Sequence, residues 1–171
     1  MNGFADRQIV GKPGHLIRRL QQIAAALFMA ETNEFDITPV QYAALLAVRL
    51  HPGIDQTALV NVIAFDRSTI GEVVTRLVAK RLVRRAKGKT DGRTKVLHVT
   101  EAGEQLLRQI DPFVRAAQRQ ILAPLSARER PLFMKMLVKL VNVNNEYSRA
   151  PRRSKDVRGR QTNRMEERLQ I

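Results

Sequence analysis

The sequence predicts a mainly α-helical fold that contains one small β-hairpin. Two patterns favour this class. Apolar residues recur at spacings of three and four over most of residues 15–148, and the pattern changes to short strands only over residues 82–99. The chain has 171 residues, of which 44% are hydrophobic, so it can bury a core. No apolar run approaches the roughly 20 residues that a membrane span needs. We therefore expect a globular protein with no membrane partner.

The first predicted helix begins after Pro13-Gly14. Its apolar residues form two neighbouring rows, and the main row is Leu16, Leu20, Ile23 and Leu27. One amphipathic helix at the end of a chain cannot bury so broad a stripe by itself. The stripe therefore implies a partner surface.

The second predicted helix starts at Thr38-Pro39-Val40-Gln41. Thr38 is placed to cap it, Gln41 completes a capping box, and Pro39 occupies the first helical position, where a missing N–H costs nothing. His51-Pro52-Gly53 ends the helix.

A pair of helices follows, and each has an aspartate at its start. Asp55 is placed to cap a short helix, and Asp66 is placed to cap a second helix from Arg67 to about Arg81. The second helix has an apolar row and a polar face, and the polar face comprises Arg67, Ser68, Thr69, Thr75, Arg76 and Lys80. Two helices joined by a short turn at residues 64–65 predict a helix-turn-helix.

Residues 82–87 and 94–99 are predicted to form two short strands. Residues 88–93 between them include Asp91-Gly92, which is a good hairpin-turn signal. A basic β-hairpin directly after a helix-turn-helix is a wing. The predicted fold class is therefore mainly α with a small β-hairpin wing, a winged helix-turn-helix.

Two helices are predicted after the wing. Thr100 is placed to cap a long helix that ends at Pro124. Residues 126–129, Ser-Ala-Arg-Glu, match a capping box that opens a last apolar helix. From residue 149 onward the chain is Arg-rich and poor in apolar residues, so we expect disorder there.

The charge of the chain is strongly positive and unevenly distributed. Lys and Arg total 30 against 16 Asp and Glu, giving +14, and residues 55–98 carry 10 basic and 4 acidic side chains. Residues 149–171 carry a further 8 basic and 3 acidic ones, which either add nonspecific DNA affinity or have no role. Such a surface attracts polyanions. Double-stranded DNA is favoured over RNA because only 5% of residues are aromatic, which leaves few platforms for base stacking.

Several chemistries find no support in the sequence. The chain has no cysteine, which removes disulfides, thiol chemistry and the common zinc-finger sites. His15, His51 and His98 lie far apart and form no HExxH pair. We expect no catalytic site, no metal and no cofactor. Because the first residues lack the pattern of a secretory signal, we expect a cytoplasmic protein.

Residues 66–107, DRSTIGEVVTRLVAKRLVRRAKGKTDGRTKVLHVTEAGEQLL, resemble the MarR family of bacterial transcription regulators. The stretch holds a capping aspartate, a helix, a basic strand, the D-x-R wing motif at Asp91-Gly92-Arg93 and a T-x-x-G helix opening at residues 100–103. The order of elements over residues 15–148 also fits. One position departs from the family, because Arg81 stands where a glycine is usual.

The resemblance implies a homodimer in which the terminal helices of both subunits interleave and two winged modules face adjacent major grooves. In many members it also implies a small phenolic or (hetero)aromatic carboxylate effector that releases the DNA. Residues 1–37 are then an N-terminal dimerisation helix, 38–100 the DNA-binding module, 101–148 the C-terminal dimerisation helices and 149–171 a basic tail.

The residues predicted to contact DNA are Arg67, Ser68, Thr69, Arg76, Lys80 and Arg93. Ser68, Thr69 and Arg76 are predicted to contact base edges and nearby phosphates, because the start of such a helix enters the groove. Arginine reads guanine bidentately, and short hydroxyls contact bases or phosphates. Arg67 and Lys80 are expected to contact phosphate, and Arg93 a narrow minor groove. The alternative is a solvated helix face, with Arg93 paired to Asp91.

A ligand site is predicted at His15, Arg19, Tyr42 and His51. By resemblance, this neighbourhood borders the crevice between the dimer helices and the DNA-binding module, and a cation beside rings suits an aromatic acid. The alternative is that the histidines only end helices and Tyr42 is part of the core. The leading function is a ligand-responsive transcription regulator, acting as a repressor on a pseudo-palindromic operator because a bound dimer blocks polymerase. The alternative function is a constitutive or architectural DNA-binding protein without an effector.

Overall fold

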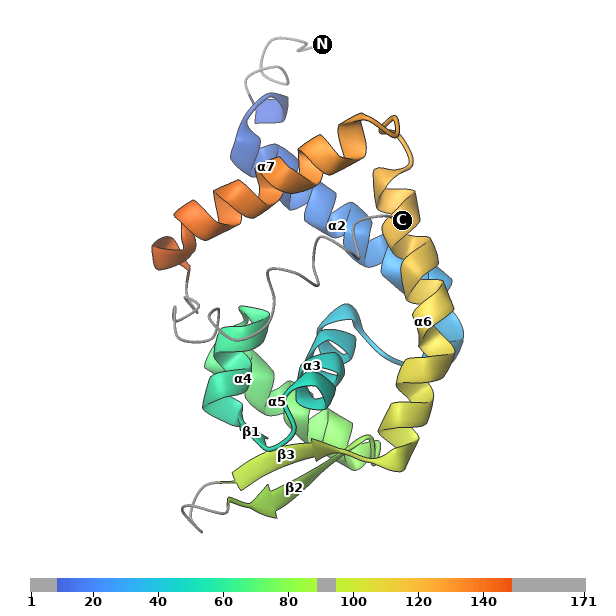
Figure 1. Ribbon diagram of the computed structural model, residues 1–171, viewed down its shortest axis with the longest axis vertical. Coiled ribbons are helices and arrows are strands. Elements are labelled where there is room, and N and C mark those ends of the chain that lie inside the picture. Colours follow the sequence, from blue (N-terminus) through green and yellow to red (C-terminus); the bar gives the residue numbers. More distant parts are fainter. Residues whose placement is uncertain (1–8, 89–94, 149–171) are drawn as a thin grey trace.

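The computed structural model describes residues 9–88 and 95–148 and confirms a mainly helical chain with a small sheet (Figure 1). The elements in chain order are α2 (Pro13–Glu31), η1 (Asn33–Phe35), α3 (Pro39–Leu50), β1 (Ile54–Asp55), α4 (Gln56–Ile63), α5 (Arg67–Ala79), β2 (Val83–Lys87), β3 (Lys95–Val99), α6 (Glu101–Leu122), α7 (Glu129–Val143) and η2 (Asn145–Tyr147). The predicted wing tip with Arg93 and the predicted basic tail lie outside the described residues.

The elements form two parts, which Figure 1 shows one above the other. The winged module consists of α3, α4, α5 and the three strands, and the helical frame consists of α2, α6 and α7. Helix α6 leaves the sheet at its first residues and then packs along α2, so it connects the two parts. Within residues 9–88 and 95–148, no helix is both long and apolar enough to cross a membrane.

The hydrophobic core lies inside the winged module and where α6 meets it. Five elements contribute large side chains that are almost completely buried, and these are Leu45 of α3, Leu59 of α4, Ile70 and Leu77 of α5, Leu97 of β3 and Ile110 of α6. The sequence predicts a buried row on α5 at Ile70, Val73, Val74, Leu77 and Val78; the first four are buried and Val78 is half-buried. The opposite face of α5 is therefore the one turned outward.

Cap hydrogen bonds confirm three of the predicted helix starts. The Thr38 hydroxyl accepts from the N–H of Gln41 at 3.3 Å, and the Thr38 N–H donates to the Gln41 side chain at 3.4 Å, which completes the capping box. Asp55 and Thr100 each accept from the N–H three residues later, at 2.8 and 3.1 Å. Helices α3, α4 and α6 therefore each begin with a side-chain cap.

Close packing explains the glycine of the T-x-x-G motif. A Cβ atom on Gly103 would lie 2.3 Å from the carbonyl oxygen of Leu82 and 2.7 Å from the side chain of Val99. The Thr100 hydroxyl also donates to the carbonyl of Arg81 at 2.6 Å. The start of α6 is therefore pressed against the segment that leads from α5 into β2.

The wing is an antiparallel pair with a third strand added. Strands β2 and β3 pair from Val83 opposite Val99 to Lys87 opposite Lys95, which confirms the predicted hairpin. Strand β1 pairs with the other edge of β3, with Ile54 opposite Leu97. The sequence did not predict β1, because a strand of two residues leaves no alternation to detect.

Helix α5 ends at Ala79 rather than near Arg81, because Arg81 is in the left-handed region with φ 59°. The N–H groups of Arg81 and Leu82 bond back to the carbonyls of Val78 and Leu77, a pattern that closes many helices and favours glycine at the left-handed position. This geometry gives a physical reason for the usual glycine of the family. Arg81 makes the same turn with a side chain.

Only half of the capping box predicted at residues 126–129 forms. Helix α7 begins at Glu129, and no side chain caps it. The Glu129 carboxylate accepts from the N–H of Ser126 at 2.8 Å. The Ser126 hydroxyl donates to the same carboxylate, so it is not the acceptor that a cap requires, and this bond is the main reason that the pKa of Glu129 is lowered.

Candidate DNA-binding interface

The start of α5 is organised by Asp66. Its carboxylate accepts from the Ser68 hydroxyl at 2.6 Å, from the Thr69 N–H at 2.8 Å and from the Thr69 hydroxyl at 2.8 Å. These hydrogen bonds, with that from the Ser68 hydroxyl first, hold the pKa of Asp66 well below its usual range. The predicted cap is confirmed, and both hydroxyls predicted to contact DNA serve as donors to it.

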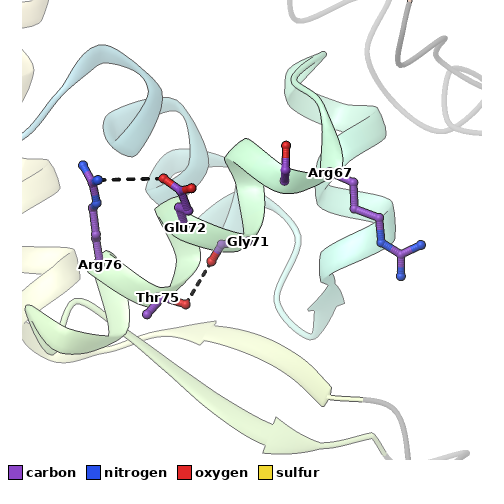
Figure 2. A pocket seen from close by; sticks show the side chains of 6 residues that line it. Arg67, Gly71, Glu72, Thr75 and Arg76 are labelled. Carbon is purple, nitrogen blue, oxygen red and sulfur yellow. Dashed lines mark hydrogen bonds and ion pairs between the residues drawn. The ribbon is translucent and has the colours of Figure 1, made fainter.

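One stripe of α5 faces solvent. An open hollow on this face is lined by Arg67, Ser68, Gly71, Glu72, Thr75 and Arg76 (Figure 2). The spacing of four between corresponding residues places them in two adjacent rows on one side of the helix. Because the buried row of α5 holds the other side against the core, this surface, which we call the α5 stripe, is what the winged module presents outward.

Interactions within the α5 stripe and with the wing position its side chains. The Arg76 guanidinium lies 3.8 Å from the Glu72 carboxylate, and both side chains are largely exposed, so the pair is easily broken. The Thr75 hydroxyl donates to the Gly71 carbonyl at 2.9 Å (dashed in Figure 2) and accepts from Arg85 of β2 at 3.3 Å. The wing strand thus supports the middle of α5.

A second hollow lies where the starts of α4 and α5 meet the wing. Its lining residues are Asp55, Gln56, Thr57, Arg67, Arg85, Lys95 and Leu97. The Asp55 carboxylate among them is bonded to the backbone of α4. Three cationic side chains from three different elements converge here, an arrangement that suits phosphate.

The structure separates the predicted DNA residues. Arg67, Ser68 and Arg76 come together on the α5 stripe. Thr69 is half-buried and its hydroxyl is held by Asp66, so it does not line the hollow. Arg93 lies outside the described residues.

Lys80 lies at the C-terminal end of α5, away from the α5 stripe. Its ammonium is 2.9 Å from the Asp36 carboxylate, and it also donates to the Asp36 carbonyl oxygen. Asp36 lies in the connection between α2 and α3 and has a left-handed backbone with φ 43°. Lys80 therefore ties the end of α5 to the connection from the helical frame.

Tyr42 is the predicted ligand residue with the most enclosed surroundings. Its ring packs against Phe28 of α2, with ring centroids 5.6 Å apart. Burial raises the pKa of the Tyr42 phenol, and the nearby charge of Asp111 adds to this shift. Tyr42 thus sits where α2 and α3 meet.

The other predicted ligand residues lie far from Tyr42 within one chain. His15 precedes Phe28 by 13 residues on α2, which is about 20 Å along the helix. Arg19 is one turn from His15 on the same exposed end. His51 follows Tyr42 by nine residues at the end of α3, about 13 Å away. A single chain therefore does not bring the four side chains together.

Sequence similarity decides the family. The transcriptional regulator HosA of Escherichia coli is 33% identical over 131 residues, which cover 77% of this chain and 96% of HosA. The chain belongs to the MarR family. The family model itself matches residues 35–94, from just before α3 into the wing. Proteins of this family are dimeric, DNA-binding transcription regulators rather than enzymes.

Solved MarR-type structures agree with the fold. The PcaV regulator from Streptomyces coelicolor, in complex with its natural ligand, is 34% identical with a TM-score of 0.70, covering 78% of this chain and 94% of PcaV. BpsR of Bordetella bronchiseptica, described with the regulation of its DNA binding by 6-hydroxynicotinic acid, is 26% identical with a TM-score of 0.72, covering 76% of this chain and 93% of BpsR.

Sequence reasoning missed part of the surface that this MarR-family chain presents. Gly71 and Glu72 line the α5 stripe, although neither residue type suggests DNA contact. The signal that could have found them is spacing, since they lie four residues after Arg67 and Ser68. The support that Arg85 gives to Thr75 joins a helix to a strand, which periodicity within one element does not predict.

The helical frame of this MarR-family chain leaves many apolar side chains uncovered. Helix α7 has no buried residue. Leu132, Met136, Leu140, Val141 and Val143 of α7 are each more than half exposed, as is Ile17 of α2. Of the apolar stripe predicted on α2, Phe28 is buried and Leu20, Ala24 and Leu27 are half-buried, while Leu16, Ile17 and Ile23 stay exposed. These apolar faces are where a dimer of the family would be expected to join.

Proposed function

We propose that this chain is a ligand-responsive transcription regulator that binds a pseudo-palindromic operator as a homodimer, acts as a repressor and is released by a small aromatic acid. The observation that carries the DNA-binding part is the α5 stripe, a polar and cationic helix face capped by Asp66 and supported by Arg85 of the wing. Membership of the MarR family supports the same role.

In this proposal α5 enters the major groove. Arg76 and Ser68 reach base edges from the α5 stripe, whereas Thr69, half-buried and with its hydroxyl held by Asp66, belongs to the cap and not to the DNA contacts. Arg67 contacts phosphate beside the second hollow. Lys80 contacts phosphate only after leaving Asp36.

Arg93 of the wing is proposed to enter a minor groove, which attracts guanidinium groups where it is narrow. The homodimer is proposed to form through the exposed apolar faces of α2 and α7. Two reading helices related by a two-fold axis then select half-sites about 10 base pairs apart. A dimer bound across a promoter blocks polymerase, which is the physical basis for repression.

The proposed effector is a small phenolic or (hetero)aromatic carboxylate. The support is that PcaV is solved with a natural ligand and that 6-hydroxynicotinic acid regulates the DNA binding of BpsR. For this chain we propose a site at His15, Arg19, Tyr42 and His51. Because these residues lie apart within one chain, the site requires the second subunit to bring the start of its α2 toward α3.

The DNA-binding proposal is tested by incubating the full chain with random duplex DNA and sequencing what it retains. We expect enrichment of a pseudo-palindrome with half-sites about one helical turn apart. Retention of DNA without any common sequence would instead favour the architectural alternative.

The effector proposal is tested by calorimetric titration of candidate aromatic acids with and without the selected operator. An effector must bind more weakly when operator is present, because the coupling between two sites is reciprocal. A tenfold effect corresponds to about 1.4 kcal/mol of coupling. An acid that binds equally in both titrations is not an effector, and an effector whose affinity survives His15→Ala, Arg19→Ala, Tyr42→Phe and His51→Ala would overturn the proposed site.

A further inference from the structure

The Ser68 hydroxyl has a fixed hydrogen-bond polarity. Its oxygen lies 2.6 Å from the Asp66 carboxylate. An ionised carboxylate only accepts hydrogen bonds, so the hydroxyl must be the donor in this contact. A hydroxyl has one proton and two acceptor positions. Ser68 therefore offers only acceptor positions to anything that approaches from outside.

Ser68 is also the hydroxyl at this cap that an approaching molecule can reach. It is exposed and lines the hollow of the α5 stripe, whereas Thr69 is half-buried and does not line it. Gly71, about one turn further along, has no side chain, so nothing projects from the adjoining surface. Within the described part of the chain, a Cβ atom there would meet only the side-chain nitrogen of Gln56, at 3.4 Å.

We propose that the Ser68 hydroxyl accepts a hydrogen bond from an exocyclic amino group, N6 of adenine or N4 of cytosine, in each half-site of the operator. The inference rests on the proposed DNA-binding function and adds to it the kind of base that this residue selects. In the major groove these amino groups are the donors that bases present, while guanine O6 and N7 and thymine O4 are acceptors. An acceptor-only hydroxyl matches the first set.

A phosphate is the competing partner for a serine on such a helix, and the Asp66 contact disfavours it. Phosphate oxygens only accept, so Ser68 would have to withdraw its proton from Asp66 and break a charge-assisted hydrogen bond. The phosphate charge would then approach a carboxylate that Ser68 already contacts at 2.6 Å. An amino group avoids both costs, because it donates to an oxygen that the Asp66 anion has polarised.

The experiment uses the full chain and the operator selected from random DNA. At each symmetric pair of positions, adenine is replaced by purine, which lacks the N6 amino group, or cytosine by pyrimidin-2-one, which lacks the N4 amino group. Dissociation constants are measured for the unmodified chain, for Ser68→Ala and for the control Thr69→Val. The control also removes a hydroxyl bonded to Asp66, but not the one that lines the hollow.

We expect one position per half-site at which loss of the amino group weakens the unmodified chain and Thr69→Val by about two- to tenfold, and leaves Ser68→Ala unchanged. Whether that position is adenine or cytosine identifies the amino group. Comparing the variants on the same modified DNA removes the effect of the weakened base pair, because that effect is the same for every protein. Circular dichroism establishes that Ser68→Ala keeps its helical content.

Two results would overturn the inference while leaving DNA binding intact. In the first, Ser68→Ala shows the same sensitivity as the unmodified chain at every position. In the second, Ser68→Ala weakens binding equally on all sequences, which indicates a phosphate contact. Failure of the unmodified chain to enrich any DNA sequence would overturn the proposed function itself.

Discussion

The winged module and the helical frame bury their apolar side chains in different ways. Within the module, Leu45 and Leu59 are completely buried by the same chain, whereas Leu132 and Leu140 of α7 are 52% and 54% exposed. A single chain therefore supplies the partners that bury the core of the module, but only some of those that the frame needs. The fold of the module is specified within one chain, and the packing of α7 is left to another surface.

Helix α6 contacts both parts, so it marks the boundary between the buried core of the module and the partly uncovered frame. Its first half contributes Leu107 and Ile110 to the core of the module, and its second half packs along α2. At this junction, α6 lies so close to the preceding segment that a Cβ atom on Gly103 would overlap the Leu82 carbonyl. Substitutions at the junction, on α7 and on α5 should therefore have effects of different kinds.

The largest effect is expected for Gly103→Ala. The new methyl group would overlap the Leu82 carbonyl, which is backbone and cannot turn away, so we expect the free energy of unfolding to fall by about 3 kcal/mol. Urea unfolding followed by circular dichroism measures it. Gly14→Ala is the matched control, because no atom of residues 9–88 or 95–148 lies within 4 Å of a Cβ atom there. Equal stability of the two variants would contradict the tight junction.

Leu140→Ser is expected to weaken the dimer by at least about 100-fold, since two leucines per dimer lose apolar burial. The winged module should stay folded, because Leu140 contributes nothing to its core. Sedimentation measured over a range of concentrations gives the dissociation constant. Leu45→Ala is the contrasting variant, and it should instead lower stability by about 2–5 kcal/mol. A chain that is fully folded and monomeric before any substitution would contradict the comparison.

Arg76→Ala is expected to reduce discrimination between operator and unrelated DNA by about 1–3 kcal/mol if Arg76 reads a base. Stability should hardly change, because the Arg76 and Glu72 side chains are 64% and 74% exposed. Fluorescence anisotropy with both kinds of DNA measures the difference. Arg108→Ala, an exposed arginine on α6, is the control. Equal losses on both DNAs would mean that Arg76 meets the backbone.

Arg81→Gly is expected to stabilise the winged module by about 1 kcal/mol, because the left-handed conformation at φ 59° costs an arginine but not a glycine. The melting temperature should rise in thermal unfolding. Arg84→Gly, in the extended strand β2, should do the opposite, since glycine weakens a strand. A lower melting temperature for Arg81→Gly would show that the Arg81 side chain is needed for packing.

A small gain in stability, about 0.5 kcal/mol, is expected for Gly71→Ala from removing a glycine inside a helix. Among the residues that the structure describes, the only neighbour of the new Cβ atom would be the flexible end of Gln56. DNA affinity should fall at the same time, because the methyl group fills part of the hollow on the α5 stripe. An unchanged affinity for the selected operator would mean that DNA does not approach Gly71.

Sequence reasoning predicted the elements whose signals are local. The caps at Thr38, Asp55, Asp66 and Thr100 each depend on one side chain and a backbone N–H three residues on, so the sequence alone specifies them. The same signal misled at Ser126, where the hydroxyl bonds to Glu129 instead.

Contacts between distant residues were beyond that reasoning. The pair of Lys80 with Asp36 joins residues 44 positions apart, and β1 exists only because β3 lies beside it. For the α5 stripe, helical spacing predicted Arg67, Ser68 and Arg76 together. The ligand residues stay a prediction, because their meeting depends on how two chains pack.

The ion pair between Lys80 and Asp36 affects how DNA binding should respond to salt. A lysine that neutralises a phosphate releases condensed counterions, and each such contact adds about 0.9 to the slope of log affinity against log salt concentration. As long as Lys80 remains 2.9 Å from the Asp36 carboxylate, its charge is already matched and it releases none. A tally of basic side chains therefore overestimates the slope, by about 0.9 for each subunit in which this pair persists.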